Sequence, residues 1–227
     1  MTQHEILKKF ISGLSQGLAN SLVVVSRAGY GKTETTMRTL EELGLQEGKH
    51  YRYLSNYITA VEFFNVLQEV NKLEEPRLLI LDDVETTLKN DRVNGLLKSA
   101  LWDVRGRRRV CWISGTHKID KKEFDFNGRI IFLLNDFKIK NPIIFAIKDR
   151  GFYYEIELTI DDMFELMRER AKVEYLNIPY AKRKEIVDFL QKVGAKSENI
   201  TLRILPKAYN MYLLSPNHWQ NLIMKLL

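Results

Sequence analysis

The segment that most constrains the fold is a glycine-rich loop between an apolar, strand-like run and a helical pattern. Residues 26–33 read Ser-Arg-Ala-Gly-Tyr-Gly-Lys-Thr and follow the apolar run 22–25. Glycines let successive backbone N–H groups turn towards phosphate oxygens, a lysine reaches the β- and γ-phosphates, and a hydroxyl ligates Mg²⁺. The loop contains all of these groups in Gly29, Gly31, Lys32 and Thr33. It therefore predicts a nucleoside triphosphate site.

The loop departs from the usual phosphate-loop pattern at its first position, where Ser26 replaces glycine. Serine is small, which allows the loop to close. The alternative is a glycine-rich turn between a strand and a helix that binds no ligand. If the loop binds a nucleotide, we expect the contacts to come from Ser26, Ala28, Gly29, Tyr30, Gly31, Lys32, Thr33 and Glu34.

Length and composition are those of an ordinary globular protein. The 227 residues suffice for one large α/β domain or for a domain with a small appendage, and 45% hydrophobic residues argue against disorder. No apolar run approaches the roughly 18 residues that span a bilayer, and residues 1–10 do not resemble a secretory signal. We expect a cytoplasmic protein with no membrane partner. The net charge of +6 fits either a polyanionic partner or a solvated basic face.

Strand-like and helical patterns alternate along the first two thirds of the chain. The runs with strand character are 22–26, 51–54, 78–81, 130–134 and 153–158. Helical spacing lies between them, over 33–43, 60–73 and 93–104. This alternation predicts a parallel, doubly wound sheet. From Asp161, which we expect to cap a helix, only helical patterns follow, so we predict an α/β core over 1–159 and a small helical domain over 160–227.

A second part of a nucleotide site follows the apolar run 78–81. Ligands of open α/β sheets bind at the carboxyl ends of strands, and this run ends in Asp82 and Asp83. Asp82 is the candidate for the Mg²⁺ shell, and Asp83 is the candidate for the carboxylate that polarises the attacking water. Glu85 is the alternative base. The alternative without a ligand is that the acid pair caps the next turn.

The loop and the Asp82 strand together resemble the P-loop ATPases of the AAA+ class, and the resemblance extends over nearly the whole chain. It implies a three-layer α/β core with a parallel sheet and a C-terminal helical lid. It also implies ATP and Mg²⁺ as ligands and ATP hydrolysis as the activity. A homo-oligomer, ring or filament, is implied because an arginine finger acts across a subunit interface.

The same resemblance implies roles for single residues in the second half of the chain. Asn135 resembles the sensor-1 asparagine, which orients the lytic water. Arg150, at the end of the segment 141–150, resembles the arginine finger, with Arg129 as its rival. Arg203 resembles the sensor-2 arginine of the helical lid, which contacts the γ-phosphate of its own subunit.

A β-hairpin is expected over 109–128, before the Asn135 strand. In viral helicases and some initiators of the AAA+ class, a hairpin at this place contacts the nucleic-acid backbone. The candidate contacts here are His117, Lys118, Lys121 and Lys122. The alternative is a charged, solvated sheet edge that blocks aggregation.

The segments 79–83, 94–101 and 124–132 resemble small ATPases carried by viruses and phages. This resemblance implies an ATP-driven role in DNA replication or DNA remodelling, in the host cell cytoplasm if the protein is viral. Two alternatives remain open. One is a nucleotide-dependent switch that loads a partner protein of replication, such as a helicase, with little hydrolysis. The other is a structural module that does not hydrolyse ATP.

Overall fold

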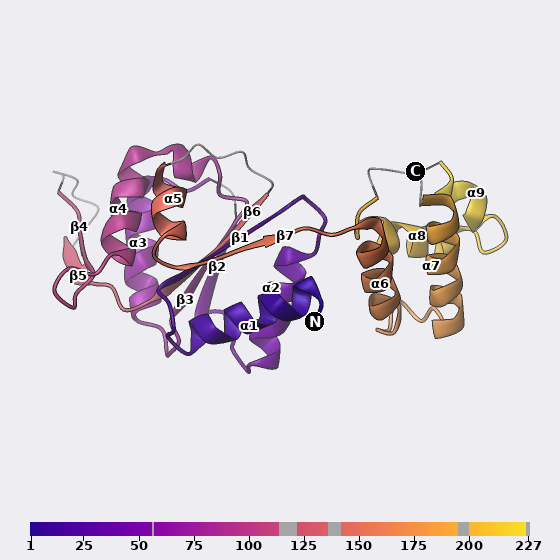
Figure 1. Cartoon of the computed structure of the whole chain (residues 1–227), viewed down its shortest axis with the longest axis horizontal. Coiled ribbons are helices and arrows are strands. Elements are labelled where there is room, and N and C mark those ends of the chain that lie inside the picture. The colour runs from indigo at the N-terminus through magenta and orange to yellow at the C-terminus, as the bar shows by residue number, and fades with distance from the viewer. Residues whose placement is uncertain (56, 114–121, 136–141, 195–199, 226–227) are drawn as a thin grey trace. The chain divides into compact units, whose positions relative to one another are not determined.

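The computed structural model describes residues 1–55, 57–113, 122–135, 142–194 and 200–225. It divides into two compact units (Figure 1). The first unit contains residues 1–27 and 32–156, and the second contains residues 28–31 and 157–227. The two units are described separately.

The first unit is built on a sheet in which every neighbouring pair of strands is parallel. The strand order is β2-β3-β6-β1-β7. The strands are β1 (Ser21–Ser26), β2 (Tyr51–Ser55), β3 (Leu78–Asp82), β6 (Arg129–Asn135) and β7 (Phe152–Ile156). Every residue of β1 and of β3 is buried, as expected for parallel strands that are covered on both faces. The prediction of a parallel, doubly wound sheet is confirmed.

Helices cover both faces of this sheet and complete three layers (Figure 1). They are α1 (Gln3–Ser15), α2 (Lys32–Glu42), α3 (Ala60–Asn71), the short 3₁₀ helix η1 (Thr87–Lys89), α4 (Asp91–Leu101) and α5 (Pro142–Lys148). One face carries α1 and α2, which pack together. The other face carries α3, α4 and α5, whose apolar side chains share one core with strand residues such as Val23, Leu79 and Phe132.

The predicted helix boundaries differ from the structure by one to three residues, and two of these differences have a clear physical cause. The helix expected over 93–104 ends at Leu101, because Trp102 has extended backbone and Val104 pairs with Arg107 across a tight turn. The helix α6 (Ile160–Ala171) is capped by Thr159 and not by Asp161. Thr159 is preferred because the Asp162 carboxylate, three residues later, accepts from the Thr159 N–H, while the Thr159 hydroxyl accepts from the Asp162 N–H in a capping box.

Two short strands, β4 (Arg109–Cys111) and β5 (Glu123–Asp125), pair antiparallel after α4. They lie within the segment where a hairpin is predicted. Three of the four candidate nucleic-acid contacts, His117, Lys118 and Lys121, lie outside the described residues, whereas Lys122 is described and exposed.

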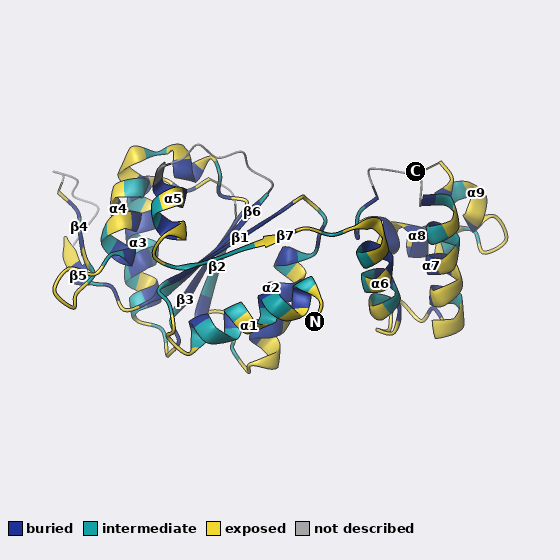
Figure 2. Cartoon of the chain, in the orientation of Figure 1, coloured by how far each residue is buried: buried dark blue, intermediate teal, exposed yellow. Residues whose placement is uncertain are grey.

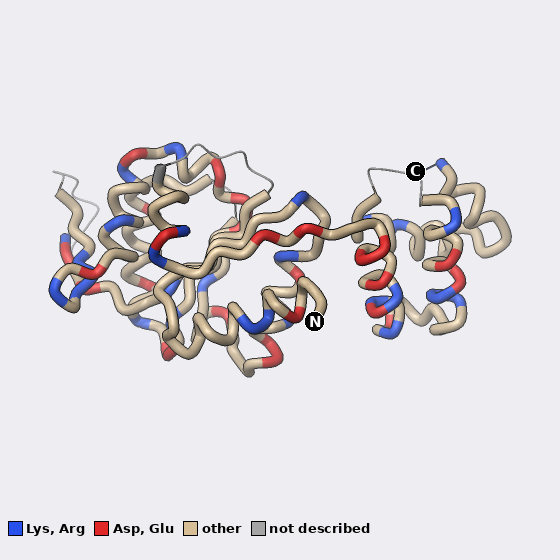
Figure 3. Tube along the Cα trace, in the orientation of Figure 1, with Lys and Arg blue, Asp and Glu red and all other residues tan. Residues whose placement is uncertain are grey.

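The second unit is helical in its assigned elements. These are α6, α7 (Tyr180–Gly194), α8 (Ile204–Leu214) and α9 (Trp219–Ile223). The interior is formed by side chains such as Phe164, Met167 and Leu190, which are fully buried. Figure 2 shows that the helices of this unit carry both buried and exposed residues. Both signs of charge alternate along α6 and α7 (Figure 3), as on helices whose outer faces contact solvent. Among the described residues, no helix combines the length and apolar character needed to cross a membrane.

A candidate nucleotide site at the carboxyl edge of the sheet

The strand register brings the predicted site residues to one edge of the sheet. Ser26 at the end of β1 lies opposite Asn135 at the end of β6, and Asp82 at the end of β3 lies opposite Leu133. Because β6 runs between β1 and β3, Asn135 lies between the strand that enters the loop and the strand that ends in Asp82. This edge is where open parallel sheets bind their ligands.

The loop uses glycine where its backbone requires it. Gly29 and Gly31 have φ values of +80° and +83°, in the left-handed region that side chains disfavour. Ser26 is different, because it is the last residue of an extended strand and is buried. Its hydroxyl donates a hydrogen bond to the Arg27 carbonyl at 3.1 Å. The backbone at this position therefore does not require the glycine that the sequence pattern specifies.

Within the second unit, the tip of the loop packs against the segment that precedes α8. The Leu202 N–H donates to the Gly29 carbonyl at 3.1 Å. A Cβ atom at Gly29 would lie only 2.8 Å from the Cβ of Thr201. Arg203, the predicted sensor-2 residue, follows directly and is exposed. A side chain at Gly29 is thus excluded by backbone conformation and by space.

Asp82 lies at the centre of a cluster of oxygen atoms. Its Oδ2 accepts hydrogen bonds from Thr33 Oγ1 at 2.7 Å and from the Tyr53 hydroxyl at 2.8 Å. The residue is 5% exposed, and its Oδ1 is buried without a hydrogen-bond partner among the described residues. A buried carboxylate oxygen with no donor is suited to a cation, and a carboxylate beside a hydroxyl is the oxygen ligand set that Mg²⁺ prefers. The residues present therefore fit the predicted Mg²⁺.

No group of three or more His, Cys, Asp or Glu side chains in the described part of the chain forms a metal site. Mg²⁺ in nucleotide-binding proteins is typically held by one or two protein ligands together with the phosphates and water. Thr33 and Asp82 match that arrangement.

Tyr53 was not predicted from the sequence. The run 51–54 indicates only a strand, and the contact arises because β2 lies next to β3 in the sheet. Burial, the hydrogen bond to Asp82 and the negative charge of Asp82 raise the pKa of Tyr53 well above its ordinary value. The hydroxyl therefore stays protonated and remains a donor to Asp82 at physiological pH.

We expect Tyr53→Phe to raise the Mg²⁺ concentration needed for half-maximal ATP turnover by several fold. The substitution removes one of the donors that hold Asp82 Oδ2 in place, so the carboxylate is less well positioned for Mg²⁺. A Mg²⁺ titration of turnover measures the effect. Tyr51→Phe is the matched control, because Tyr51 lies on the same strand and its register partner is Leu78. Equal Mg²⁺ curves for the two variants would refute a role for Tyr53.

A second group of hydrogen bonds converges on Asn135. Lys32 Nζ donates to Asn135 Oδ1 at 2.7 Å, and Asn135 Nδ2 donates to Asp83 Oδ1 at 2.7 Å. The backbone N–H of Asn135 donates to Glu85 Oε1 at 2.8 Å. Asn135 therefore contacts the loop lysine and Asp83 through its side-chain amide, and Glu85 through its backbone N–H.

The two candidate bases differ in their surroundings. Asp83 is exposed, has a φ of +53° at the bend after β3, and contacts a side-chain amide. Glu85 is half-buried, and one of its oxygens accepts from the backbone. An exposed carboxylate beside an amide is the better arrangement for holding water, whereas the bond of Glu85 positions the end of β6.

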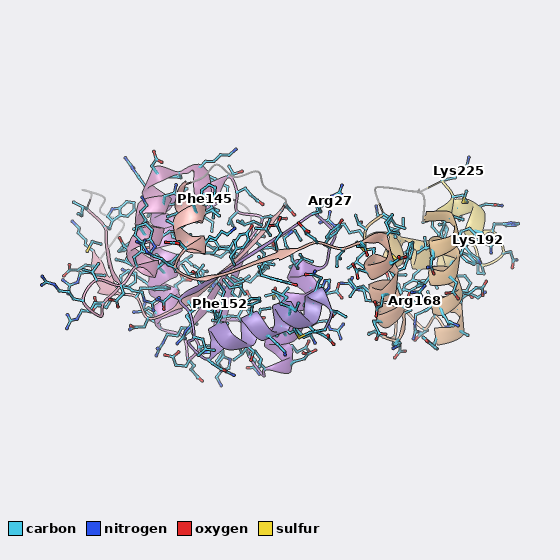
Figure 4. All side chains as sticks on the ribbon, viewed as in Figure 1. Arg27, Phe145, Phe152, Arg168, Lys192 and Lys225 are labelled. Atoms are coloured by element: carbon cyan, nitrogen blue, oxygen red, sulfur yellow. The ribbon has the colours of Figure 1, made fainter. Side chains whose placement is uncertain are left out.

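The two arginine candidates lie in different surroundings. Arg129 begins β6, at the opposite end of the strand from Asn135, and pairs with Glu75 at 3.2 Å. Arg150 follows α5, is exposed, and has its guanidinium carbon 4.4 Å from the centre of the Trp102 ring. Phe145 on α5 (Figure 4) is 60% exposed. An arginine and a large apolar side chain are thus both accessible around this helix.

The remaining predicted contacts lie in the loop or directly after it. Ala28 and Glu34 are exposed, and Tyr30 is 8% exposed. Lys32 is buried, so its long side chain points its ammonium group to Asn135 and not to bulk solvent.

No family model and no curated protein sequence matches the chain. Solved structures do match. A RuvB variant from Thermotoga maritima aligns with 98% of this chain and 67% of its own chain, at 15% identity and a TM-score of 0.56. PCH-2 from C. elegans aligns with 98% of this chain and 66% of its own, at 11% identity and a TM-score of 0.52. Identities this low establish the fold alone. The chain has the fold of the AAA+ P-loop NTPases, as the sequence predicted.

Proposed function

We propose that this protein hydrolyses ATP as a subunit of a homo-oligomer and acts in DNA replication or DNA remodelling. The observation that carries the proposal is the Asn135 side chain, which is hydrogen-bonded to both Lys32 and Asp83 at the carboxyl edge of the sheet. A loop lysine, a water-holding carboxylate and an amide between them are the groups that phosphoryl transfer to water requires.

Each residue has a defined task in this proposal. Lys32 places its charge on the phosphates, and Asp83 and Asn135 hold the attacking water in line. Thr33 and Asp82 would hold Mg²⁺, which neutralises phosphate charge when it is bound. Arg203 contacts the γ-phosphate of its own subunit, and this role is supported by the packing of the preceding residues, Thr201 and Leu202, against the loop glycine.

The proposed polymer substrate is DNA, contacted by the hairpin residues His117, Lys118, Lys121 and Lys122. The net charge of +6 and the resemblance to virus and phage ATPases support it. The competing proposal is a cytoplasmic switch that loads a partner protein of replication. Steady-state hydrolysis with and without single- and double-stranded DNA separates the two, because a motor is stimulated by DNA. Turnover that stays near zero in all three conditions, with ATP still bound, would favour the switch.

We expect Arg150→Ala to leave nucleotide affinity nearly unchanged and to reduce turnover by at least about a thousandfold, as loss of an arginine finger does. The finger would act on the ATP of the neighbouring subunit, for which the exposure of Arg150 and Phe145 provides an accessible surface. Arg129→Ala is the comparison, because it removes the rival arginine at the other end of β6.

A mixing experiment tests action between subunits. Arg150→Ala subunits mixed with Asp83→Asn subunits should regain activity, since some interfaces then combine an intact finger with an intact base. Inactivity at every ratio, in oligomers shown to be mixed, would count against a finger supplied by the neighbour.

A further inference from the structure

A basic cleft lies in the first unit, away from the Asp82 and Asn135 side chains. It has a volume of about 660 Å³ and lies between the end of α4, the turn that follows and β4. Its lining includes two apolar side chains and four cations, namely Trp102 and Val104 with Lys98, Arg105, Arg107 and Arg109. The turn is visible in Figure 3 as a group of Lys and Arg residues next to β4.

The positive charge of this cleft is incompletely neutralised. Arg109 Nε lies 3.5 Å from Asp125, and Lys98 lies over the Trp102 ring at 5.6 Å. Arg105 and Arg107 form no ion pair with any described residue. None of the lining residues that the structure describes is acidic. The lining therefore attracts an anionic ligand.

The turn that carries these arginines is held in shape by its backbone. Val104 and Arg107 exchange hydrogen bonds at 2.9 and 3.3 Å, and the Gly106 N–H donates to Asp103 at 2.7 Å. Arg105 and Gly106 adopt φ values of +58° and +81°, which close the turn. Two arginines are thus displayed on a short, hydrogen-bonded loop. Asp103, the carboxylate nearest to them in sequence, accepts the Gly106 N–H within the turn and forms no ion pair with a described residue.

Apolar surface accompanies the charge. Val104 is 71% exposed, although it lies in the cleft lining, and Trp102 packs partly against the core of the unit. A polyanion that offers only charge would leave this surface in contact with water. A single-stranded nucleic acid offers phosphates for the cations and unpaired base faces for the apolar side chains. In a duplex, the base faces are stacked inside the helix.

We propose that this cleft binds single-stranded nucleic acid, with phosphates at Arg105 and Arg107 and a base against Val104 and the edge of Trp102. This site is a contact surface in addition to the hairpin, and the choice of nucleic acid as its ligand rests on the proposed function. The described lining contains none of the predicted nucleotide-site residues, so binding is measured without nucleotide.

The test is a salt titration of the affinity of the full chain for a fluorescent oligothymidylate, followed by anisotropy. Arg105→Ala combined with Arg107→Ala should weaken binding at least tenfold at low salt. The slope of log affinity against log salt should become shallower by about 1.4, since each single-strand phosphate contact contributes about 0.7. Val104→Ser should weaken binding a few fold without changing the slope, because it removes apolar surface and no charge. Trp102 is left intact because its ring also contacts Arg150.

The matched control is Lys9→Ala combined with Arg38→Ala, which removes the same charge from exposed positions on α1 and α2. If this control lost as much oligonucleotide affinity, the effect would be one of net charge, and the proposed binding at the cleft would be wrong. Unchanged affinity in the Arg105 and Arg107 variant would also overturn the proposal. The same holds if the variants lose as much affinity for a duplex as for the single strand, or if polyglutamate displaces the probe as effectively as unlabelled oligonucleotide does. An oligouridylate series assigns the polymer as DNA or RNA. Basal ATP hydrolysis of the same variants should equal that of the parent, so loss of binding and failure of the ATPase proposal are separate outcomes.

Discussion

ATP affinity is expected to fall by at least about a hundredfold when Lys32 is replaced by alanine. The ammonium group of Lys32 is the cation that the loop directs to the β- and γ-phosphates. It is already buried and aimed along the carboxyl edge of the sheet, 2.7 Å from Asn135 Oδ1. Its loss removes both the charge and the directed hydrogen bond. Calorimetric titration with ATP and Mg²⁺ measures the change.

Arg38→Ala is the control for Lys32→Ala, because Arg38 lies on the same helix, carries the same charge and is exposed. We expect it to bind ATP as the parent does. If Lys32→Ala also bound ATP with the parental affinity while remaining folded, the assignment of the loop as a phosphate site would be wrong.

Turnover is expected to fall by at least about a hundredfold in Asp83→Asn, with ATP binding largely intact. The carboxylate would act on the attacking water in the transition state, so its loss appears in kcat and not in affinity. Asparagine keeps the shape of the side chain and still accepts the hydrogen bond that Asn135 Nδ2 donates. The expected loss of turnover is therefore caused by the loss of the negative charge. Single-turnover hydrolysis together with nucleotide titration separates the two quantities.

Glu85→Gln is the matched substitution two residues away. We expect a much smaller loss of turnover, because a glutamine oxygen still accepts from the Asn135 backbone N–H and preserves the end of β6. An inactive Glu85→Gln beside an active Asp83→Asn would reverse the assignment and make Glu85 the base.

Most of the core fold can be predicted from the sequence because its strands and helices have different hydrophobic periods. The runs at 22–25 and 78–81 are apolar at every position, as is typical of strands that are buried on both faces, and both form such strands. Helix ends were harder to predict. Asp161 and Thr159 are both good caps, and the choice depends on the side chain three residues later. The early end of α4 depends on the turn that follows it, whose left-handed residues are Arg105 and Gly106. The glycine is a signal for such a turn, but an arginine seldom adopts a positive φ, so the sequence does not place the turn reliably.

Some residues of the candidate site can be predicted from a single segment of the sequence, whereas others depend on how the strands are ordered in the sheet. Lys32, Thr33 and Asp82 follow from motifs that the chain carries within single segments. Tyr53 was not predicted, since its contact with Asp82 requires that β2 and β3 be neighbours, and strand order is a tertiary property. The hydrogen bond between Asn135 and Lys32 likewise requires β6 to lie beside β1.

The unpaired oxygen of Asp82 has a consequence for the stability of the fold. A buried acceptor loses its hydrogen bonds to water on folding, and if no protein donor replaces them the free energy of unfolding falls by about 1–3 kcal/mol. Native domains of ordinary size are stable by only about 5–15 kcal/mol, so this is a substantial fraction. A residue chosen for stability alone at the end of β3 would be apolar, like the four that precede it. The first unit therefore folds with an unsatisfied acceptor at this position. If Mg²⁺ binds there as proposed, it would offset this cost and link the stability of the protein to Mg²⁺ binding.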